Sequence, residues 1–210
     1  MTPSKLPPQH SNHQVQEILI LASASPQRKT LLEGLGLTFE VFPSSVDEHG
    51  HPERHNPAQR AKLLAELKAR DVAAKHPGAW VIGCDTLVVS PGGLIFEKPR
   101  TEEEARNMIQ AQSGRTSVVH SGLSVLTPEG LHFDGVSSSD VRFKKMTEKE
   151  IDWWIATGLW KGRSGSFQID GPGQLMIEEI CGDWSGIVGL PVFLLGQLLE
   201  KAGFERPGKV

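Results

Sequence analysis

The chain has 210 residues, a formal net charge of −3 and 38% hydrophobic residues. This composition is typical of a globular protein with a sizeable core rather than a disordered chain. The lack of a basic excess disfavours extended binding to nucleic acid, although a few local cations suffice to hold a small anionic ligand. No apolar run reaches the roughly 18 residues that a membrane span needs, so we expect a cytoplasmic protein with no membrane attachment.

The elements predicted from periodicity, caps and turn residues alternate between strands and helices. In chain order we expect a strand at 18–22, a helix from 26 to about 36, a strand at 38–42, a loop at 44–55, a helix from 57 to about 74 and a strand at 80–89. A helix from 102 to about 114, strands at 117–126 and 135–143, a helix from 148 to about 158 and a helix from 191 to about 202 follow. This alternation predicts an α/β fold.

Helix starts are marked by residues that satisfy free backbone N–H groups. Ser25 before Pro26 pairs an N-cap with a proline in the first turn, as does Asn56 before Pro57. The segments 101–104 and 147–150 each fit a capping box, in which threonine is followed three residues later by glutamate.

Outside these elements, residues 1–16 are rich in Pro, His, Ser and Gln, and we expect a disordered tail there and a short tail at 205–210. Residues 17–204 are expected to form a single domain. The two cysteines, Cys84 and Cys181, are too few for a disulfide framework or a cysteine-rich zinc site. Because both lie in apolar stretches, we predict buried free thiols.

The turn Ser23-Ala24-Ser25-Pro26-Gln27-Arg28 is the clearest candidate for chemistry. A buried strand leads here into a helix N-terminus, whose free N–H groups and positive dipole end favour an anion. Ser23 adds a hydroxyl, and Arg28 can bind phosphate oxygens with its fork of donors. The alternative is that Ser25 only caps the helix and that Arg28 is a surface residue.

Asp85 is the second candidate, because it interrupts the apolar strand at 80–89. A carboxylate in such a strand is costly unless it is paired, binds metal or lies at the strand's end in a cleft. Those environments are typical of metal ligands and general bases. The alternative is a structural aspartate that caps a turn.

Charged residues elsewhere are weaker candidates. Asp47 and Glu48 are adjacent acids on a predicted loop and suit a hard divalent cation, although such pairs are usually only solvated. Lys68 lies on the alanine-rich face of its helix, and Lys98 is followed by Pro99. Each lysine either neutralises phosphate charge or is simply solvated.

Taken in order, these pieces resemble the Maf family of nucleoside triphosphate pyrophosphatases. The matching pieces are Leu21 to Arg28, Val46 to Glu48, Lys68-Ala69, Gly83 to Thr86, Lys98-Pro99, Ser113-Gly114 with His120, Gly182 to Trp184 and Val188 to Pro191. They span roughly residues 18 to 202. Each piece is weak alone, whereas the ordered set is specific.

The resemblance implies a fold, an activity and roles for residues. The fold is a mixed sheet with two lobes around a cleft, related to the inosine triphosphate pyrophosphatases, and the domain at 17–204 is catalytic. The activity is house-cleaning hydrolysis of a nucleoside triphosphate to the monophosphate and pyrophosphate with Mg²⁺ or Mn²⁺. The implied roles are proton acceptor for Asp85, phosphate contacts for Ser23, Arg28, Lys68 and Lys98, metal ligands at Asp47, Glu48 and Asp85, and base selection by Arg28 and Thr86.

A third position for base selection departs from the family. Asp170 lies where members that act on dTTP and UTP carry Gln and those that act on 7-methyl-GTP carry Glu. An ionised Asp offers acceptors only, which suits a guanine edge, whereas Thr86 matches the pyrimidine group. Both dTTP/UTP and 7-methyl-GTP therefore stay open as substrates. The resemblance also suggests a homodimer. The alternative to an enzyme is a non-catalytic nucleotide-binding regulator of cell division.

Overall fold

The computed structural model describes residues 18–48 and 56–205. The predicted tail at 1–16, nearly all of the tail at 205–210 and residues 49–55 of the predicted loop lie outside the described residues. Within the described ranges, no helix combines the length and the apolar character that crossing a membrane requires.

The elements alternate broadly as predicted. In chain order they are β1 (Leu19–Leu21), α1 (Pro26–Glu33), β2 (Glu40–Val41), α2 (Pro57–Ala73), β3 (Trp80–Val89), β4 (Ile95–Phe96), α3 (Glu102–Gln112), β5 (Thr116–Leu126), β6 (His132–Phe143), α4 (Glu148–Thr157), the 3₁₀ turns η1 (Ser164–Ser166) and η2 (Pro172–Met176), β7 (Ile177–Cys181), α5 (Trp184–Val188) and α6 (Val192–Ala202).

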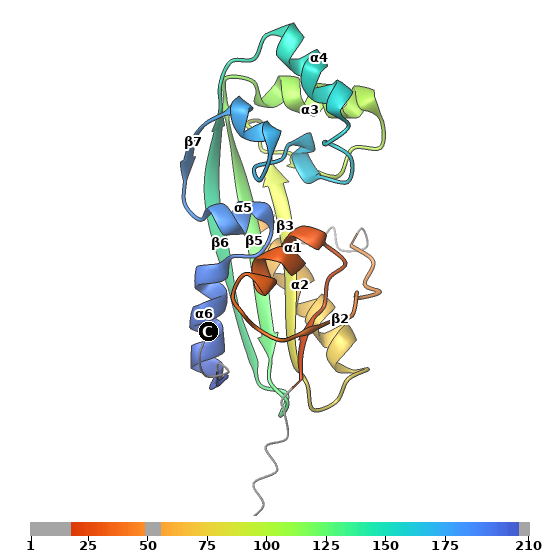
Figure 1. Cartoon of the computed structure of the whole chain (residues 1–210), viewed down its shortest axis with the longest axis vertical. Coiled ribbons are helices and arrows are strands. Elements are labelled where there is room, and N and C mark those ends of the chain that lie inside the picture. Colours follow the sequence, from red (N-terminus) through yellow and green to blue (C-terminus); the bar gives the residue numbers. More distant parts are fainter. Residues whose placement is uncertain (1–17, 49–55, 206–210) are drawn as a thin grey trace, which may run out of the picture.

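The strands of the described ranges form one seven-stranded mixed sheet in the order β2-β1-β3-β5-β6-β7, with β4 paired to β3. β1 is parallel to β2 and to β3, whereas β3, β5, β6 and β7 pair antiparallel. Figure 1 shows β3, β5 and β6 running along the long axis of the molecule, with α3 and α4 at one end and α1, α2 and α6 around the other. The predicted mixed α/β sheet is confirmed.

Helix α2 packs unusually closely against β3 and β5 because glycines line the strands beneath it. A Cβ atom on Gly83 would lie 2.1 Å from the Ala65 carbonyl oxygen, and one on Gly122 would lie 2.3 Å from that of Ala61. Alanines on the inner face of the helix complete this contact. The close approach brings the next polar residue of that face, Lys68, over the middle of β3.

Two of the three hydrophobic clusters in the described residues lie on either side of the middle of the long strands. One cluster contains Val88 of β3 and Val119 of β5 together with residues of α3 and α4. The other contains Ile82 of β3 and Leu123 of β5 together with residues of β1 and α6. Residues 85–87 of β3 therefore lie between the two cores, and they include the polar pair Asp85 and Thr86.

Several local predictions are wrong in informative ways. β4, β7 and α5 were not expected, because each has five residues or fewer and carries no clear periodicity. The predicted strand at 38–42 is reduced to the two residues of β2. Cys84 is buried as predicted, but Cys181 is exposed, because β7 lies at the edge of the sheet.

The two predicted capping boxes also differ. At α4 both halves form, since the Glu150 carboxylate accepts from Thr147 N at 2.8 Å and Thr147 Oγ1 accepts from Glu150 N at 3.4 Å. At α3 only the threonine half forms. The Glu104 carboxylate binds Arg100 instead, accepting from its backbone N–H and its guanidinium, each at 2.7 Å.

Candidate active site

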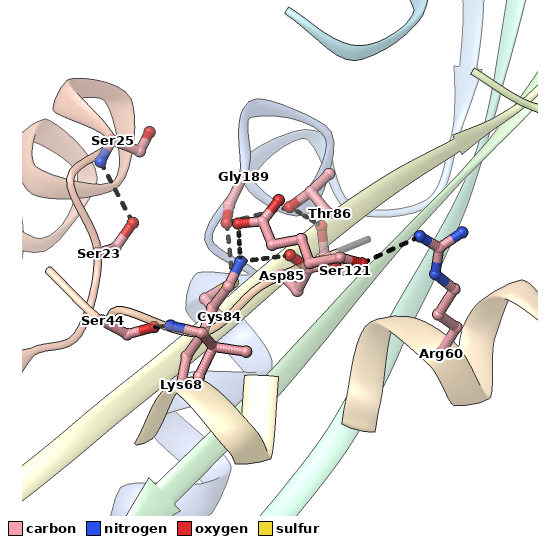
Figure 2. Close-up of polar contacts among 12 residues, drawn as sticks. Ser23, Ser25, Ser44, Arg60, Lys68, Cys84, Asp85, Thr86, Ser121 and Gly189 are labelled. Atoms are coloured by element: carbon pink, nitrogen blue, oxygen red, sulfur yellow. Dashed lines mark hydrogen bonds and ion pairs between the residues drawn. The ribbon is translucent and has the colours of Figure 1, made fainter. Parts of the chain in front are cut away.

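The turn between β1 and α1 is ordered by two serine hydroxyls. Ser25 caps α1, its Oγ accepting from Arg28 N at 3.4 Å, and Pro26 is the first residue of the helix. Ser23, which is buried, accepts from Ser25 N at 3.2 Å, as Figure 2 shows. The prediction of a capped helix start after a buried strand is confirmed.

The Arg28 guanidinium folds back across this turn. Its Nη1 donates to Ser23 Oγ at 3.0 Å, its Nη2 to Thr86 Oγ1 at 3.2 Å and its Nε to the Gly189 carbonyl oxygen at 2.9 Å. These bonds join the turn to β3 and to the residue that ends α5. Arg28 is therefore a fixed part of the structure and not a freely solvated surface residue.

A directional chain of hydrogen bonds continues from Arg28 beneath the turn. Ser121 Oγ donates to the Gly186 carbonyl oxygen at 2.6 Å, so its proton is not available for its other neighbour, Thr86. The 2.9 Å bond between the Thr86 and Ser121 hydroxyls is then donated by Thr86. Thr86 thus accepts a hydrogen bond from Arg28 and donates one to Ser121.

Lys68 occupies the centre of the site. Its Nζ lies 2.6 Å from Asp85 Oδ1 and 2.7 Å from Glu48 Oε1. The Lys68 side chain is 8% exposed and that of Asp85 6%, whereas that of Glu48 is 45% exposed. Figure 2 shows Lys68 and Asp85 meeting beside Thr86 and Ser121. Three residues with predicted roles are thus joined by one ammonium group.

The second Asp85 oxygen has an unusual environment. Asp85 Oδ2 is buried, and it makes no hydrogen bond within the described residues. A buried carboxylate oxygen without a partner carries a large desolvation cost. Together with the Glu48 carboxylate, it offers two hard oxygen donors at one place, which fits a Mg²⁺ or Mn²⁺ ion. Asp85 and Glu48 are therefore the residues that would hold such an ion, with the exposed Asp47 beside them.

The pKa of Glu48 is lowered by all three basic side chains predicted to contact phosphate. Partial burial opposes its ionisation, but the hydrogen bond from Lys68 and the charges of Lys68, Lys98 and Arg28 outweigh burial and lower the pKa of Glu48 below its usual 4.5. Lys98 is exposed and is the second residue after β4. Its charge acts on Glu48, so the structure brings Lys98 into the neighbourhood of the Lys68 group.

Asp170 does not join this group through any hydrogen bond or ion pair found in the described ranges. Its carboxylate oxygen Oδ1 lies 3.7 Å from Arg163 Nη1, in the segment between η1 and η2. The turn η1, which precedes this segment, contacts the residue before Lys98, because Gly165 N donates to the Glu97 carbonyl oxygen at 3.4 Å. Among the residues predicted to select the base, Arg28 and Thr86 are in direct contact and Asp170 is turned toward a cation.

Arg60 and Ser121 belong to the same neighbourhood but were not predicted. Arg60 Nη2 lies 3.4 Å from both the Glu48 carbonyl oxygen and Glu97 Oε1. The signal for Arg60 was present, since it is a cation in the first turn of a helix, like Arg28. Ser121 gave no signal, because a serine within an apolar strand is common.

Two other features lie outside this site. Glu66, His132 and Asp134 cluster closely enough to hold a metal ion, but Arg70 lies 2.8 Å from Glu66 and Lys62 lies 3.0 Å from Asp134. These ion pairs already neutralise both carboxylates. A pocket of about 440 Å³ beside α1 and β2 contains none of the predicted residues. Its lining residues are Lys29, Glu33, Leu37, Thr38, Phe39 and Val41.

The fold and the site define a mixed α/β protein with clustered arginine, lysine and carboxylate groups suited to a phosphate-bearing ligand. Residues 18–202 match the family model described as Maf-like protein. The chain therefore belongs to the Maf family, as the sequence pieces predict.

Named relatives cover nearly the whole chain. A protein of Deinococcus radiodurans named dTTP/UTP pyrophosphatase is 42% identical over 190 residues, which are 90% of this chain and 95% of that protein. Proteins of the same name from Syntrophotalea carbinolica and Pyrococcus horikoshii are 41% and 34% identical, each over 90% of this chain, and over 86% and 98% of their own lengths.

Some solved structures are similar to part of the chain. One is a nucleoside-triphosphatase or dITP/XTP pyrophosphatase of Mycobacterium abscessus, with a TM-score of 0.40 at 16% identity, covering 61% of this chain and 75% of that one. Another is a HAM1 protein of Coxiella burnetii, with a TM-score of 0.43 at 14% identity, covering 62% of this chain and 74% of that one.

Proposed function

We propose that this chain is a nucleoside triphosphate pyrophosphatase that hydrolyses dTTP and UTP to the monophosphate and pyrophosphate. The observation that carries the proposal is the buried Asp85 carboxylate, which shares the Lys68 ammonium with Glu48 and keeps one oxygen without a partner among the described residues. Membership of the Maf family and the names of the relatives support the same reaction.

In this reaction Asp85 accepts the proton of the attacking water. The water oxygen forms a bond to the α-phosphorus, and the bond from that phosphorus to the oxygen bridging to the β-phosphate breaks. Arg28, Lys68 and Lys98 stabilise the negative charge that builds up on the leaving pyrophosphate, and Ser23 donates a hydrogen bond to the phosphates. A divalent cation, Mg²⁺ or Mn²⁺, supplies further charge neutralisation when bound at Asp85 and Glu48, with Asp47 beside them.

The preference for dTTP and UTP over 7-methyl-GTP rests on two observations. The hydrogen bond from Arg28 fixes Thr86, the residue that matches the pyrimidine group of the family. The Asp170 carboxylate faces Arg163, so its charge is partly compensated and less available to the donor edge of a guanine. The relatives named dTTP/UTP pyrophosphatase support this choice.

The wider setting follows from the same proposal. Residues 17–204 act as a single catalytic domain, a boundary that the match over residues 18–202 supports. The protein acts in the cytoplasm as a homodimer, takes a nucleoside triphosphate as its partner and has no need of nucleic acid or membrane.

The test is pyrophosphate release from dTTP, UTP, CTP, GTP and 7-methyl-GTP with Mg²⁺ or Mn²⁺, in the unmodified chain and in Asp85→Asn. We expect dTTP and UTP to be preferred and Asp85→Asn to lose at least about a hundredfold in kcat, the usual effect of removing a general base. Asp134→Asn is the matched control, because it removes the partner of Lys62 outside the site and should retain turnover.

Two results would contradict the proposal. Turnover by Asp85→Asn within about tenfold of the unmodified chain would exclude Asp85 as the base, since that loss is too small for general base catalysis. Nucleotide binding without pyrophosphate release from any member of the panel would instead favour the non-catalytic regulator.

A further inference from the structure

Lys68 is shared between two acids that are also the predicted ligands of the divalent cation. Its ammonium contacts one oxygen of Asp85 at 2.6 Å and one of Glu48 at 2.7 Å. One positive charge thus faces two negative charges in a largely buried place. The group carries a net negative charge, and Asp85 Oδ2 still lacks a partner within the described residues. A site of this kind retains the capacity to bind a further or a stronger cation.

A cation bound to the same two carboxylates would lie close to the Lys68 ammonium, even where it used an oxygen that Lys68 leaves free, such as Asp85 Oδ2. A divalent ion bound to carboxylate oxygens lies about 2.0–2.6 Å from them, and Lys68 Nζ already lies within 2.7 Å of one oxygen of each acid. Two like charges that close repel strongly in a buried environment. Binding of an ion at these carboxylates therefore favours a movement of the Lys68 ammonium away from them.

The Lys68 side chain is able to move because only its end is held by specific bonds. Lysine carries its charge on a flexible four-carbon stem, in contrast to the rigid fork of arginine. Its backbone is fixed, because α2 rests on Gly83 and Gly122. The charges of Arg28, Lys68 and Lys98 all act on Glu48, and the proposed function assigns the phosphates to these three cations, so a released ammonium would turn to the phosphate oxygens.

We propose that Lys68 is an exchangeable counter-ion, which neutralises Asp85 and Glu48 until a divalent cation replaces it and then turns to the phosphates of the substrate. The inference rests on the proposed function and adds to it a coupling between metal binding and triphosphate binding. Metal and triphosphate should bind synergistically, because the metal releases the lysine and the phosphates accept it.

When the Lys68 charge is removed, the proposal predicts a higher affinity for the metal and a lower affinity for the substrate. Removing the Lys68 charge removes a competitor of the metal, so Lys68→Met and Lys68→Gln should bind Mn²⁺ more tightly, by about fivefold or more, given the strength of charge interactions at this separation. The same variants should lose at least about tenfold in affinity for the nucleoside triphosphate, since they lack a cation for its phosphates. If Lys68 were purely structural, the same variants would lose affinity for both Mn²⁺ and the nucleotide.

The experiment is a calorimetric Mn²⁺ titration of the full chain without nucleotide, compared with Lys68→Met, Lys68→Gln and Lys68→Arg. Lys68→Arg retains the charge and should not gain affinity. Lys144→Met is the matched control, because Lys144 forms an equally short ion pair of 2.6 Å with Glu150 outside the site. Thermal unfolding with and without Mn²⁺ gives a second measurement, in which the rise in Tm should be larger for both neutral variants than for the unmodified chain.

The outcomes separate this inference from the proposed function. Unchanged or weaker Mn²⁺ binding in both neutral variants, together with an unchanged rise in Tm, overturns the exchange. Asp85→Asn serves as the reference for the metal site itself. If Asp85→Asn binds Mn²⁺ as tightly as the unmodified chain, the metal is held elsewhere and the proposed metal site fails. If Asp85→Asn loses Mn²⁺ while the neutral Lys68 variants show no gain, only the exchange fails.

Discussion

Arg28 and Arg60 each place a cation in the first turn of a helix, where the helix dipole disfavours positive charge by roughly 0.3–1 kcal/mol. Arg28 is compensated by three hydrogen bonds of 2.9 to 3.2 Å. Arg60 is compensated poorly, because its two contacts are 3.4 Å long and its buried Nε has no partner within the described residues. An arginine in such a place contributes little to stability, so its contacts point to a role in the site.

That role is to connect two segments of the site. Arg60 Nη2 reaches the backbone of Glu48 and the side chain of Glu97, which directly precedes Lys98. We expect Arg60→Met to reduce kcat/KM for the preferred nucleotide by about tenfold, because small displacements of binding groups are costly in catalysis. Steady-state kinetics over a range of Mg²⁺ concentrations measures the effect.

The control for Arg60 lies on the same helix. Arg70 pairs with Glu66 at 2.8 Å and has a half-exposed side chain, so Arg70→Met should leave kcat/KM unchanged and cost little stability. A value for Arg60→Met within twofold of that for Arg70→Met would show that Arg60 does not position the site.

The contact of α2 with the sheet determines where Lys68 lies. The Ala65 carbonyl oxygen and Ala69 lie where a Cβ atom of residue 83 would be, at 2.1 and 2.8 Å. Gly83→Ala should therefore push the helix outward, at a cost of about 1–3 kcal/mol in the free energy of unfolding. Because Lys68 moves with the helix, turnover should fall as well. Urea unfolding and steady-state kinetics on the same preparation measure both effects.

Gly92→Ala is the corresponding control for a glycine with space around it. The nearest atom to a Cβ there is Ser90 Oγ at 3.8 Å, so the change should alter stability by less than about 0.5 kcal/mol, as surface substitutions usually do. If Gly83→Ala were as stable and as active as Gly92→Ala, the close approach of α2 would not be what positions Lys68.

Much of the fold was predictable because the signals are local. Ser25 and Asn56 form the caps expected before Pro26 and Pro57. The long strand with a carboxylate inside its apolar run is β3, and its Asp85 is buried as the costly position implied. These features depend on the residues next to them in the chain, and the sequence displays them directly.

The assembly of the site was less predictable because it depends on tertiary contacts. The pairing of Lys68 with both Asp85 and Glu48 requires α2, β3 and the loop before α2 to be in place. Gly189 accepts from Arg28 only because α5 ends beside the first turn of α1, across 161 residues of sequence. Family resemblance supplied the candidate residues, but not which of them contact one another.

The whole molecule should unfold as one unit, because β3, β5 and β6 each contribute to the cores at both ends. A titrating group far from the site therefore affects overall acid stability. Lys144 and the backbone and hydroxyl of Thr147 lower the pKa of Glu150 from 4.5 to about 2. A lowered carboxyl pKa contributes stability above the ordinary value, and that contribution is lost as the pH falls.

Glu150→Gln should therefore lower the Tm near neutral pH, because the neutral amide lacks the charge that pairs with Lys144 and with the positive end of the α4 dipole. The difference in Tm between the unmodified chain and Glu150→Gln should shrink as the pH falls from about 4.5 toward about 2, where Glu150 becomes protonated. Thermal unfolding by circular dichroism across this range measures it, and turnover per folded molecule near neutral pH should stay unchanged. A Tm difference that is constant with pH would mean that Glu150 stabilises α4 through packing rather than through its charge.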